Sequence, residues 1–224
     1  MAGTGMKGWR ASRLAARMLA AGGLCCVLAG CFSVPRETRE TVRTFVLTLD
    51  AQSNGADAPP AKPGAGLLVV NVPQAQPGFE SPNMAYVQRP YEIGYYAAHQ
   101  WAEAPSRMLQ PLLVRTLERT GVWRAVMAMP TSVRGDVRLD LDQVVLVQEF
   151  LQRPSRVLVS LRAQLIAMPS YQVVGIRRFE MSEPAPTDDA YGGAVAANRA
   201  LQILLKDLGD WAAGCVNARP AGAC

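Results

Sequence analysis

The side chains that could perform catalysis are few in this sequence, and they form no recognised catalytic pattern. His99 is the only histidine, and it stands between Tyr96 and Trp101, which is more typical of a packed side chain than of a general base. Carboxylates cluster at Asp136, Asp140 and Asp142. Paired glycosidase carboxylates would line a cleft with aromatic sugar platforms, and nothing marks one here. The Gly-x-Ser-x-Gly, His-Glu-x-x-His, Walker and Rossmann glycine motifs are also missing. We therefore expect no enzyme activity, no metal and no cofactor.

The thiol of Cys31 is a better candidate for chemistry because of the residues in front of it. The first seventeen residues carry only basic charges, at Lys7, Arg10, Arg13 and Arg17. An uncharged apolar run of 13 residues follows, from Met18 to Gly30. A transmembrane anchor is the alternative interpretation, but spanning a bilayer core takes roughly 20 residues. The pattern predicts that residues 1–30 are a cleaved signal peptide.

The four residues Leu28-Ala29-Gly30-Cys31 resemble a lipobox, the processing signal of bacterial lipoproteins. The resemblance implies that the Cys31 thiol receives a diacylglyceryl group and that cleavage falls between Gly30 and Cys31. Cys31 would then be the new N-terminus and would carry the lipid (palmitate-type) anchor. The mature protein is thus expected to be a globule outside the cytoplasm, held at a membrane by its first residue.

Removal of the signal peptide changes the charge of the protein. The chain has 23 Lys and Arg against 18 Asp and Glu, and four of the basic residues lie in the signal. The mature part therefore carries 19 minus 18, or +1. This balance gives no reason to expect a nucleic-acid partner. The remaining residues, 31–224, suffice for one domain and a tether.

Only Cys215 and Cys224 are left in the mature part after Cys31. In an oxidising compartment they could form a disulfide that closes a small loop in the Gly/Ala/Pro-rich tail. Two free thiols are the alternative. Neither interpretation makes them catalytic, since no histidine lies near them in the sequence.

The arrangement of apolar residues predicts the elements of the domain. Residues 31–43 are a charged, lipidated tether, residues 44–213 the domain and residues 214–224 a tail. Apolar or alternating runs predict strands at 45–49, 67–72, 84–89, 91–97, 122–127, 136–147, 156–167 and 171–180. Residues 51–66 have the composition of a loop. Long neighbouring strands with short connections favour an antiparallel meander.

Two segments have helical periodicity. The first begins at Pro105 and ends at Gly121, with Pro111 either kinking it or marking its true start. The second is capped by Asp188-Asp189 and runs through Trp211. The predicted fold class is therefore α+β: an antiparallel sheet with two main amphipathic helices packed on one face.

Aromatic side chains are concentrated between Met84 and Trp101. They are Tyr86, Tyr91, Tyr95, Tyr96 and Trp101. Such amphipathic rings suit a surface that binds a partner or a cargo, although we expect at least half of them to pack in the core. Tyr95 and Tyr96 must face opposite sides of a strand, so that one can be core and the other surface.

An ordered set of segments resembles the ABC-type transport auxiliary lipoprotein family, the PqiC-like proteins. The set is Phe45-Val46-Leu47, Val70-Asn71-Val72-Pro73, Met84-Ala85-Tyr86, Arg89-Pro90-Tyr91-Glu92, His99-Gln100-Trp101-Ala102-Glu103-Ala104-Pro105 and Gly121-Val122-Trp123. With the lipobox, the resemblance covers residues 28–213. The chain departs from the family pattern in the long loop at 51–66, in Pro111 and in the cysteine-containing tail.

The resemblance implies a non-enzymatic lipoprotein subunit of an MCE/ABC-type system that carries lipids or other apolar molecules between membranes. The implied partners are a periplasmic MCE-domain protein, a permease and an ATPase. Residue 32 is Phe rather than the Asp associated with inner-membrane retention, which implies an outer-membrane anchor facing the periplasm. A stand-alone lipid-binding lipoprotein and a hydrolase that uses His99 are the competing hypotheses.

Overall fold

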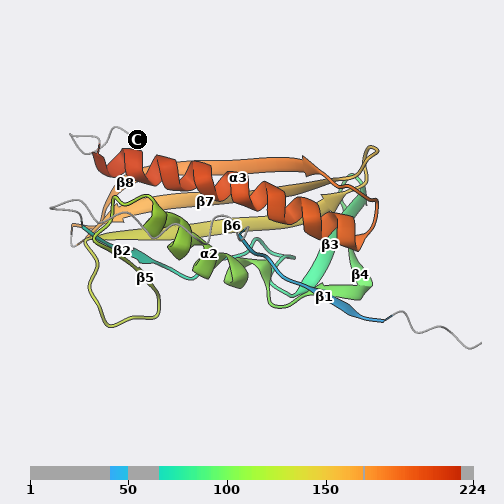
Figure 1. The fold of residues 1–224 in the computed structure, drawn as a ribbon, viewed down its shortest axis with the longest axis horizontal. Helices are drawn as coiled ribbons and strands as arrows, with labels where there is room; N and C mark the ends of the chain where they lie inside the picture. Colours follow the sequence, from blue (N-terminus) through green and yellow to red (C-terminus); the bar gives the residue numbers. More distant parts are fainter. Residues whose placement is uncertain (1–40, 50–65, 169, 218–224) are drawn as a thin grey trace, which may run out of the picture. The chain divides into compact units, whose positions relative to one another are not determined.

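Two helices cover one face of a curled sheet, to which eight strands contribute in the described part of the chain (Figure 1). The computed structural model describes residues 41–49, 66–168 and 170–217, which belong to a unit that begins at Thr41. The elements are β1 (Arg43–Phe45), β2 (Leu67–Val70), β3 (Asn83–Arg89), β4 (Glu92–Trp101), α2 (Pro105–Arg119), β5 (Ala125–Ala128), β6 (Val137–Glu149), β7 (Arg156–Ala167), β8 (Gln172–Pro184) and α3 (Ala190–Asn217). The predicted cleavage site at Gly30 and Cys31, the loop at 51–65 and Cys224 lie outside the described residues.

The α+β class is confirmed, and the sheet is mixed rather than purely antiparallel. β6, β7 and β8 form the expected antiparallel meander. β2 and β3, by contrast, both pair with β6 in parallel, and β1 pairs with β4 in parallel. Parallel neighbours need long crossover connections, and alternation of side chains does not reveal the direction of the neighbouring strand.

The core lies between β6–β8 and the helices, as expected for helices packed on one face. β7 shows why this face is buried: its alternate residues Val157, Val159, Leu161, Ala163 and Leu165 are all nearly inaccessible to solvent. The opposing side of α3 is rich in alanine, with Ala196, Ala197 and Ala200 fully buried. Because these side chains are small, α3 can approach the sheet closely while Leu201, Leu204, Leu205 and Leu208 fill the core.

α2 begins at Pro105 and contains Pro111, so Pro111 does not mark the start of the helix. Pro111 lies on the exposed side, where a lost backbone hydrogen bond is least costly. Thr120 is the C-cap, and Gly121 follows it with φ 63°, the left-handed conformation that glycine adopts readily at this position. Neither α2 nor α3, the helices of the described residues, is apolar enough over a sufficient length to cross a membrane.

The structure places several boundaries differently from the prediction: β4 and β8, for example, each extend four residues further, to Trp101 and Pro184. Two differences concern α3. β1 ends at Phe45, because residues after it leave the sheet and bond to α3: Asn198 accepts a hydrogen bond from the Thr48 amide at 2.7 Å and donates one to the Val46 carbonyl at 3.2 Å. α3 extends to Asn217, so the helix includes residues 214–217, which the sequence places in the tail.

Candidate functional site

The predicted aromatic residues lie on the β3–β4 hairpin, which turns at Pro90 and Tyr91. Tyr91 and Tyr95 are exposed, Tyr86 and Tyr96 are half-buried, and Trp101 is buried. Tyr95 and Tyr96 do face opposite ways, since the Tyr95 hydroxyl donates to the Gly78 carbonyl while Tyr96 points toward β6. The hairpin therefore offers only part of the expected aromatic surface to solvent.

Most of the remaining rings pack against one another. Tyr86 and Tyr96 meet edge to face, with centroids 5.1 Å apart, and Tyr86 also contacts Phe150. Gly94 makes this possible, because a Cβ there would come within 2.6 Å of the Tyr86 ring. The predicted surface role of Tyr86 and Tyr96 thus competes with a structural role, which the contacts favour.

His99 lies between two aromatic rings. Its ring centroid is 6.0 Å from that of Phe45 and 6.1 Å from that of Tyr96. Phe45 also contacts Trp101 and, on α3, Tyr191. These contacts join β1, β4 and the start of α3. They are the packed environment expected for His99 from its aromatic neighbours.

A chain of hydrogen bonds through the buried Gln148 and Ser155 connects the hairpin to the start of α3. The Tyr96 hydroxyl donates to Gln148 Oε1 at 3.0 Å, and Gln148 Nε2 donates to Ser155 Oγ at 2.9 Å. The Ser155 amide then donates to Asp188 Oδ1 at 2.7 Å. Burial, followed by the charge of Asp189, raises the pKa of Tyr96 to about 12, so its hydroxyl remains a neutral donor at physiological pH.

Gln148 and Ser155 are 3% and 0% exposed, and neither was predicted from the sequence. A signal was present for Gln148, because it shares the core-facing side of β6 with Leu146, two residues earlier. A polar residue in an apolar register is buried at a cost unless it is hydrogen-bonded. Gln148 is therefore the polar centre that fixes the hairpin against the helical layer.

The predicted helix cap is present at Asp189. Asp189 Oδ1 accepts hydrogen bonds from the Gly192 amide at 2.7 Å and from the Thr187 hydroxyl at 2.8 Å. The bond from Gly192, followed by that from Thr187, holds the pKa of the Asp189 carboxyl below its usual value. The neighbouring Asp188 carboxyl also has a lowered pKa, because Ser155 donates to it.

Because the folded-state pKa of Asp189 is lowered, its stabilisation is fully present above its unfolded pKa of about 4 and is lost as pH falls through the lower folded value. We expect Asp189→Ala to lower the free energy of unfolding at pH 7 by about 1 kcal/mol, the usual cost of a lost N-cap. Asp189→Asn keeps the accepting oxygen but does not titrate, so its stability should fall less steeply below pH 4. Urea unfolding between pH 2.5 and 7 measures both effects; equal acid sensitivity of wild type and Asp189→Asn would contradict the assignment.

The carboxylate cluster lies on the sheet face opposite the helices. Arg162 Nε donates to Asp142 Oδ1 at 2.8 Å, and this bond holds the pKa of the Asp142 carboxyl below its usual value. Asp140 accepts bonds from Arg138 and from the Asn71 amide group. Asp142 is thus paired with an arginine of the adjacent strand β7, and Asp140 with an arginine of its own strand and with Asn71 after β2, an arrangement that differs from a pair of catalytic acids facing a cleft.

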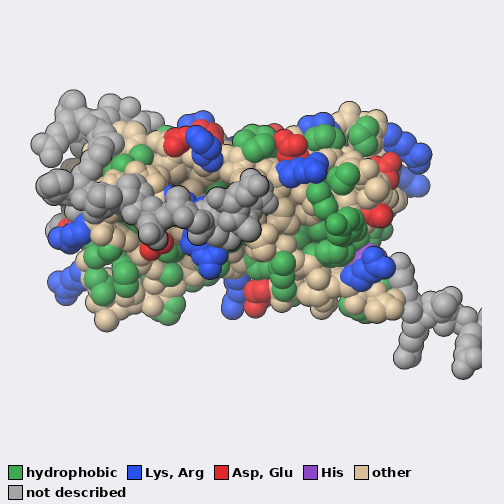
Figure 2. Space-filling model, viewed as in Figure 1, with side chains coloured by type: hydrophobic (Ala, Val, Ile, Leu, Met, Phe, Trp, Pro, Cys, Tyr) green, Lys and Arg blue, Asp and Glu red, His purple; other side chains and the backbone are tan. Residues whose placement is uncertain are grey.

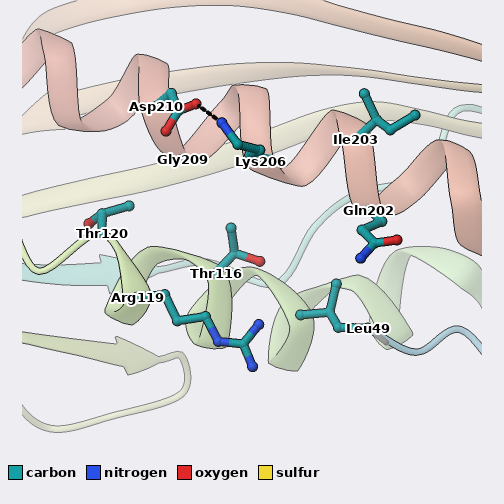
Figure 3. Close-up of a pocket in the computed structure, with 9 residues that line it drawn as sticks. All are labelled: Leu49, Thr116, Arg119, Thr120, Gln202, Ile203, Lys206, Gly209 and Asp210. Carbon is teal, nitrogen blue, oxygen red and sulfur yellow. Dashed lines mark hydrogen bonds and ion pairs between the residues drawn. The ribbon is translucent and has the colours of Figure 1, made fainter. Parts of the chain in front are cut away.

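Two open grooves follow α3 and were not foreseen from the sequence. One, of about 510 Å³, lies between α2 and α3 and is lined by Leu49, Thr116, Arg119, Thr120, Gln202, Ile203, Lys206, Gly209 and Asp210 (Figure 3). The other, of about 580 Å³, lies between the segment after β1 and α3. Gln202 lines both grooves. Figure 2 shows apolar side chains gathered near the histidine at the right end of the molecule, where the start of α3 meets β1.

Cys215 lies in the last turn of α3, is 4% exposed and is disulfide-bonded. The predicted partner, Cys224, is outside the described residues, so their pairing stays a prediction. Among the described residues, no three His, Cys, Asp or Glu side chains lie close enough together to hold a metal ion.

The chain belongs to the ABC-type transport auxiliary lipoprotein component family, whose model matches residues 47–209. This confirms the family that the ordered motifs suggested. It is a family of transport auxiliary lipoproteins rather than of enzymes. A search of curated proteins found no match.

Solved structures confirm the fold. The chain is similar to protein XCC0632 from Xanthomonas campestris, of family DUF330, with a TM-score of 0.67 and 23% identity over 78% of this chain and 96% of that one. It is also similar to a protein described as uncharacterized, with a TM-score of 0.56 and 14% identity over 77% of this chain and 99% of that one. At these sequence identities, the similarity shows only that the fold is shared.

Proposed function

We propose that this chain is a non-enzymatic accessory subunit of an intermembrane transport system, anchored to the outer membrane through Cys31 and docking a periplasmic MCE-domain protein. The system would also contain an ABC permease and an ATPase, and its cargo would be a lipid or another apolar molecule. The observation that carries the proposal is the family match, which spans nearly the whole described domain. The lipobox before Cys31 and the Phe at position 32 support the anchor and its membrane.

The packing of the domain favours a docking subunit over a stand-alone lipid carrier. Two interior cavities between the helices and the sheet have volumes of only about 10 Å³ each. A cavity of roughly 10–15 Å³ holds about one water molecule, whereas ligand pockets measure about 300–1,000 Å³. Neither of these cavities can hold an acyl chain. The two open grooves beside α3, of about 510 and 580 Å³, have room for a cargo molecule.

The proposal predicts a specific partner. Tagged full-length protein, solubilised from native membranes with a mild detergent after crosslinking in intact cells, should co-isolate an MCE-domain protein identified by mass spectrometry. If such a protein never co-isolates, the accessory-subunit proposal is wrong. An unrelated outer-membrane lipoprotein with the same tag is the matched control for non-specific capture.

A second measurement separates the stand-alone carrier from the accessory subunit. Native mass spectrometry of the Cys31→Ser form should find it free of lipid if docking is the function, because the two cavities between the helices and the sheet are too small for an acyl chain. Stoichiometric bound lipid without any partner would favour the carrier and would point to a groove beside α3.

A further inference from the structure

We infer that the turns at one end of the sheet form a second contact with the membrane that carries the lipid anchor. The contact consists of Tyr91 and Ile93 on the β3–β4 hairpin and Leu151 after β6, and we call it the terminal apolar patch. The inference rests on the proposed lipidation of Cys31. Its occupant is the headgroup region of the phospholipid bilayer in which that lipid is inserted.

The three residues of the terminal apolar patch are large, apolar and accessible. Tyr91 is fully exposed, Leu151 is 53% exposed and Ile93 is 40% exposed. Single exposed apolar residues are common on soluble domains, but three of them on two neighbouring turns are not. A tyrosine among aliphatic side chains suits a bilayer interface, where the ring enters the acyl boundary and the hydroxyl remains hydrated.

The patch is held together by strand pairing. β3 and β6 run in parallel, with Val87 opposite Glu149. The Phe150 amide donates to the Val87 carbonyl at 2.8 Å, which fixes the start of the β6–β7 turn beside the end of β3. The two turns therefore project from the same end of the sheet. Arg89 and Arg153 are exposed beside them and can meet lipid phosphates, although Glu92 is exposed there too, so the contact is mainly apolar.

The tether enters at this same end. β1 is parallel to β4 and begins at Arg43, opposite His99, which lies eight residues along the chain from Tyr91. Figure 1 shows β1, the β3–β4 hairpin and the β6–β7 turn together at the right, and the β7–β8 connection at the left. Because β1 and β4 are parallel, the chain before Arg43 runs toward the hairpin turn, so the tether approaches the domain from the side of the terminal apolar patch.

The length of the tether limits which end of the sheet can lie on the bilayer. Ten Cα–Cα steps lead from Cys31 to Thr41, and they span at most about 35 Å when fully extended. β7 has 12 residues, so the sheet extends about 40 Å from the β6–β7 turn to the β7–β8 turn. A tether that ran back along the whole sheet would be too short. The end with Tyr91 can thus rest on the membrane, and the β7–β8 end is directed away from it.

The chain supplies a matched control at the opposite end. Tyr171, before β8, is 67% exposed and has φ 58°, and Tyr91 has φ 69°. Both tyrosines occupy the left-handed region in a turn between antiparallel strands, so any effect of ring exposure or of turn strain should be shared. The two differ in their position relative to the tether.

The test places photoreactive p-benzoylphenylalanine at position 91, at position 151 or at position 171 of the full-length lipoprotein in intact cells. After irradiation, we expect phospholipid adducts at positions 91 and 151, at least tenfold more than at position 171. Position 151 lies on a different turn from position 91, so adducts at both positions exclude an effect that is confined to the hairpin turn. Three outcomes would overturn the inference. They are equal lipid adducts at all three positions, adducts only to protein at positions 91 and 151, and no lipid adduct at position 91 or at position 151.

The same samples separate this inference from the proposals on which it rests. The intact mass of the mature protein shows whether Cys31 is acylated, so a missing anchor is recognised directly. An adduct to an MCE-domain protein at position 171 would support the proposed function independently. Acylated protein without lipid adducts at positions 91 and 151 would refute the second contact and leave the anchor in place.

Discussion

Replacing Gly192 by alanine is expected to lower the free energy of unfolding by about 3 kcal/mol, the upper part of the range for overpacked sites. Gly192 is buried in the first turn of α3, and a Cβ there would overlap the carbonyl oxygen of Thr187. That oxygen belongs to the backbone, so the clash requires the segment before α3 to move. Such a movement would also disturb the Gly192 amide bond to Asp189.

The control for this prediction is the same substitution later in the same helix. Gly214 is exposed, and a Cβ there would meet nothing within 4 Å. Gly214→Ala should therefore raise the free energy of unfolding by about 0.5–1 kcal/mol through helix propensity alone. Urea unfolding of both variants, in the oxidised state that keeps the Cys215 disulfide, measures the difference. Similar stabilities for the two variants would show that the turn before α3 is not as closely packed as described.

The largest expected effect on the behaviour of the protein comes from Cys31→Ser. A hydroxyl cannot replace the thiol as the lipid acceptor, so the variant should lose the anchor. Each buried methylene of an acyl chain contributes about 0.8 kcal/mol to membrane binding, so the loss removes nearly all of the affinity. Fractionation should move the protein from the membrane pellet to the soluble fraction, provided that an alternative signal cleavage occurs, or leave an uncleaved precursor that lacks lipid.

Cys26→Ser is the matched control for the anchor. Cys26 lies in the same apolar run but is removed with the signal in the proposed processing. This variant should remain in the membrane fraction, and its mature mass should equal that of the wild type. Membrane retention of Cys31→Ser with an unchanged acylated mass would disprove the assignment of Cys31.

Local periodicity was sufficient to predict most elements of this fold. The strict alternation in residues 156–167 corresponds to β7, and the spacing of apolar residues after Asp189 corresponds to α3. The parallel pairing of β2 with β6 was not predictable in this way, because it depends on which crossover brings two distant segments together. The early end of β1 also escaped prediction, since it depends on one side chain, Asn198, that lies 150 residues away from Thr48 in sequence.

The candidate site was predicted less completely than the fold. Sequence composition located the aromatic hairpin, but it could not separate the exposed Tyr91 from the packed Tyr86 and Tyr96. That distinction depends on Gly94, whose missing side chain makes room for the Tyr86 ring. The direction from which the tether approaches these rings was not predictable either, because it depends on the parallel register of β1 on β4.

The position of α3 at the end of the chain has a consequence for when the protein can fold. A secreted chain emerges from the membrane with its N-terminus leading, so the strands appear on the far side before the helix that covers them. Until α3 follows, the apolar face of β7 has no cover, and Val46 and Thr48 lack their bonding partner Asn198. Contacts between residues so far apart in sequence also close slowly. The core is therefore completed only after α3, residues Ala190–Asn217, has followed the strands that it covers.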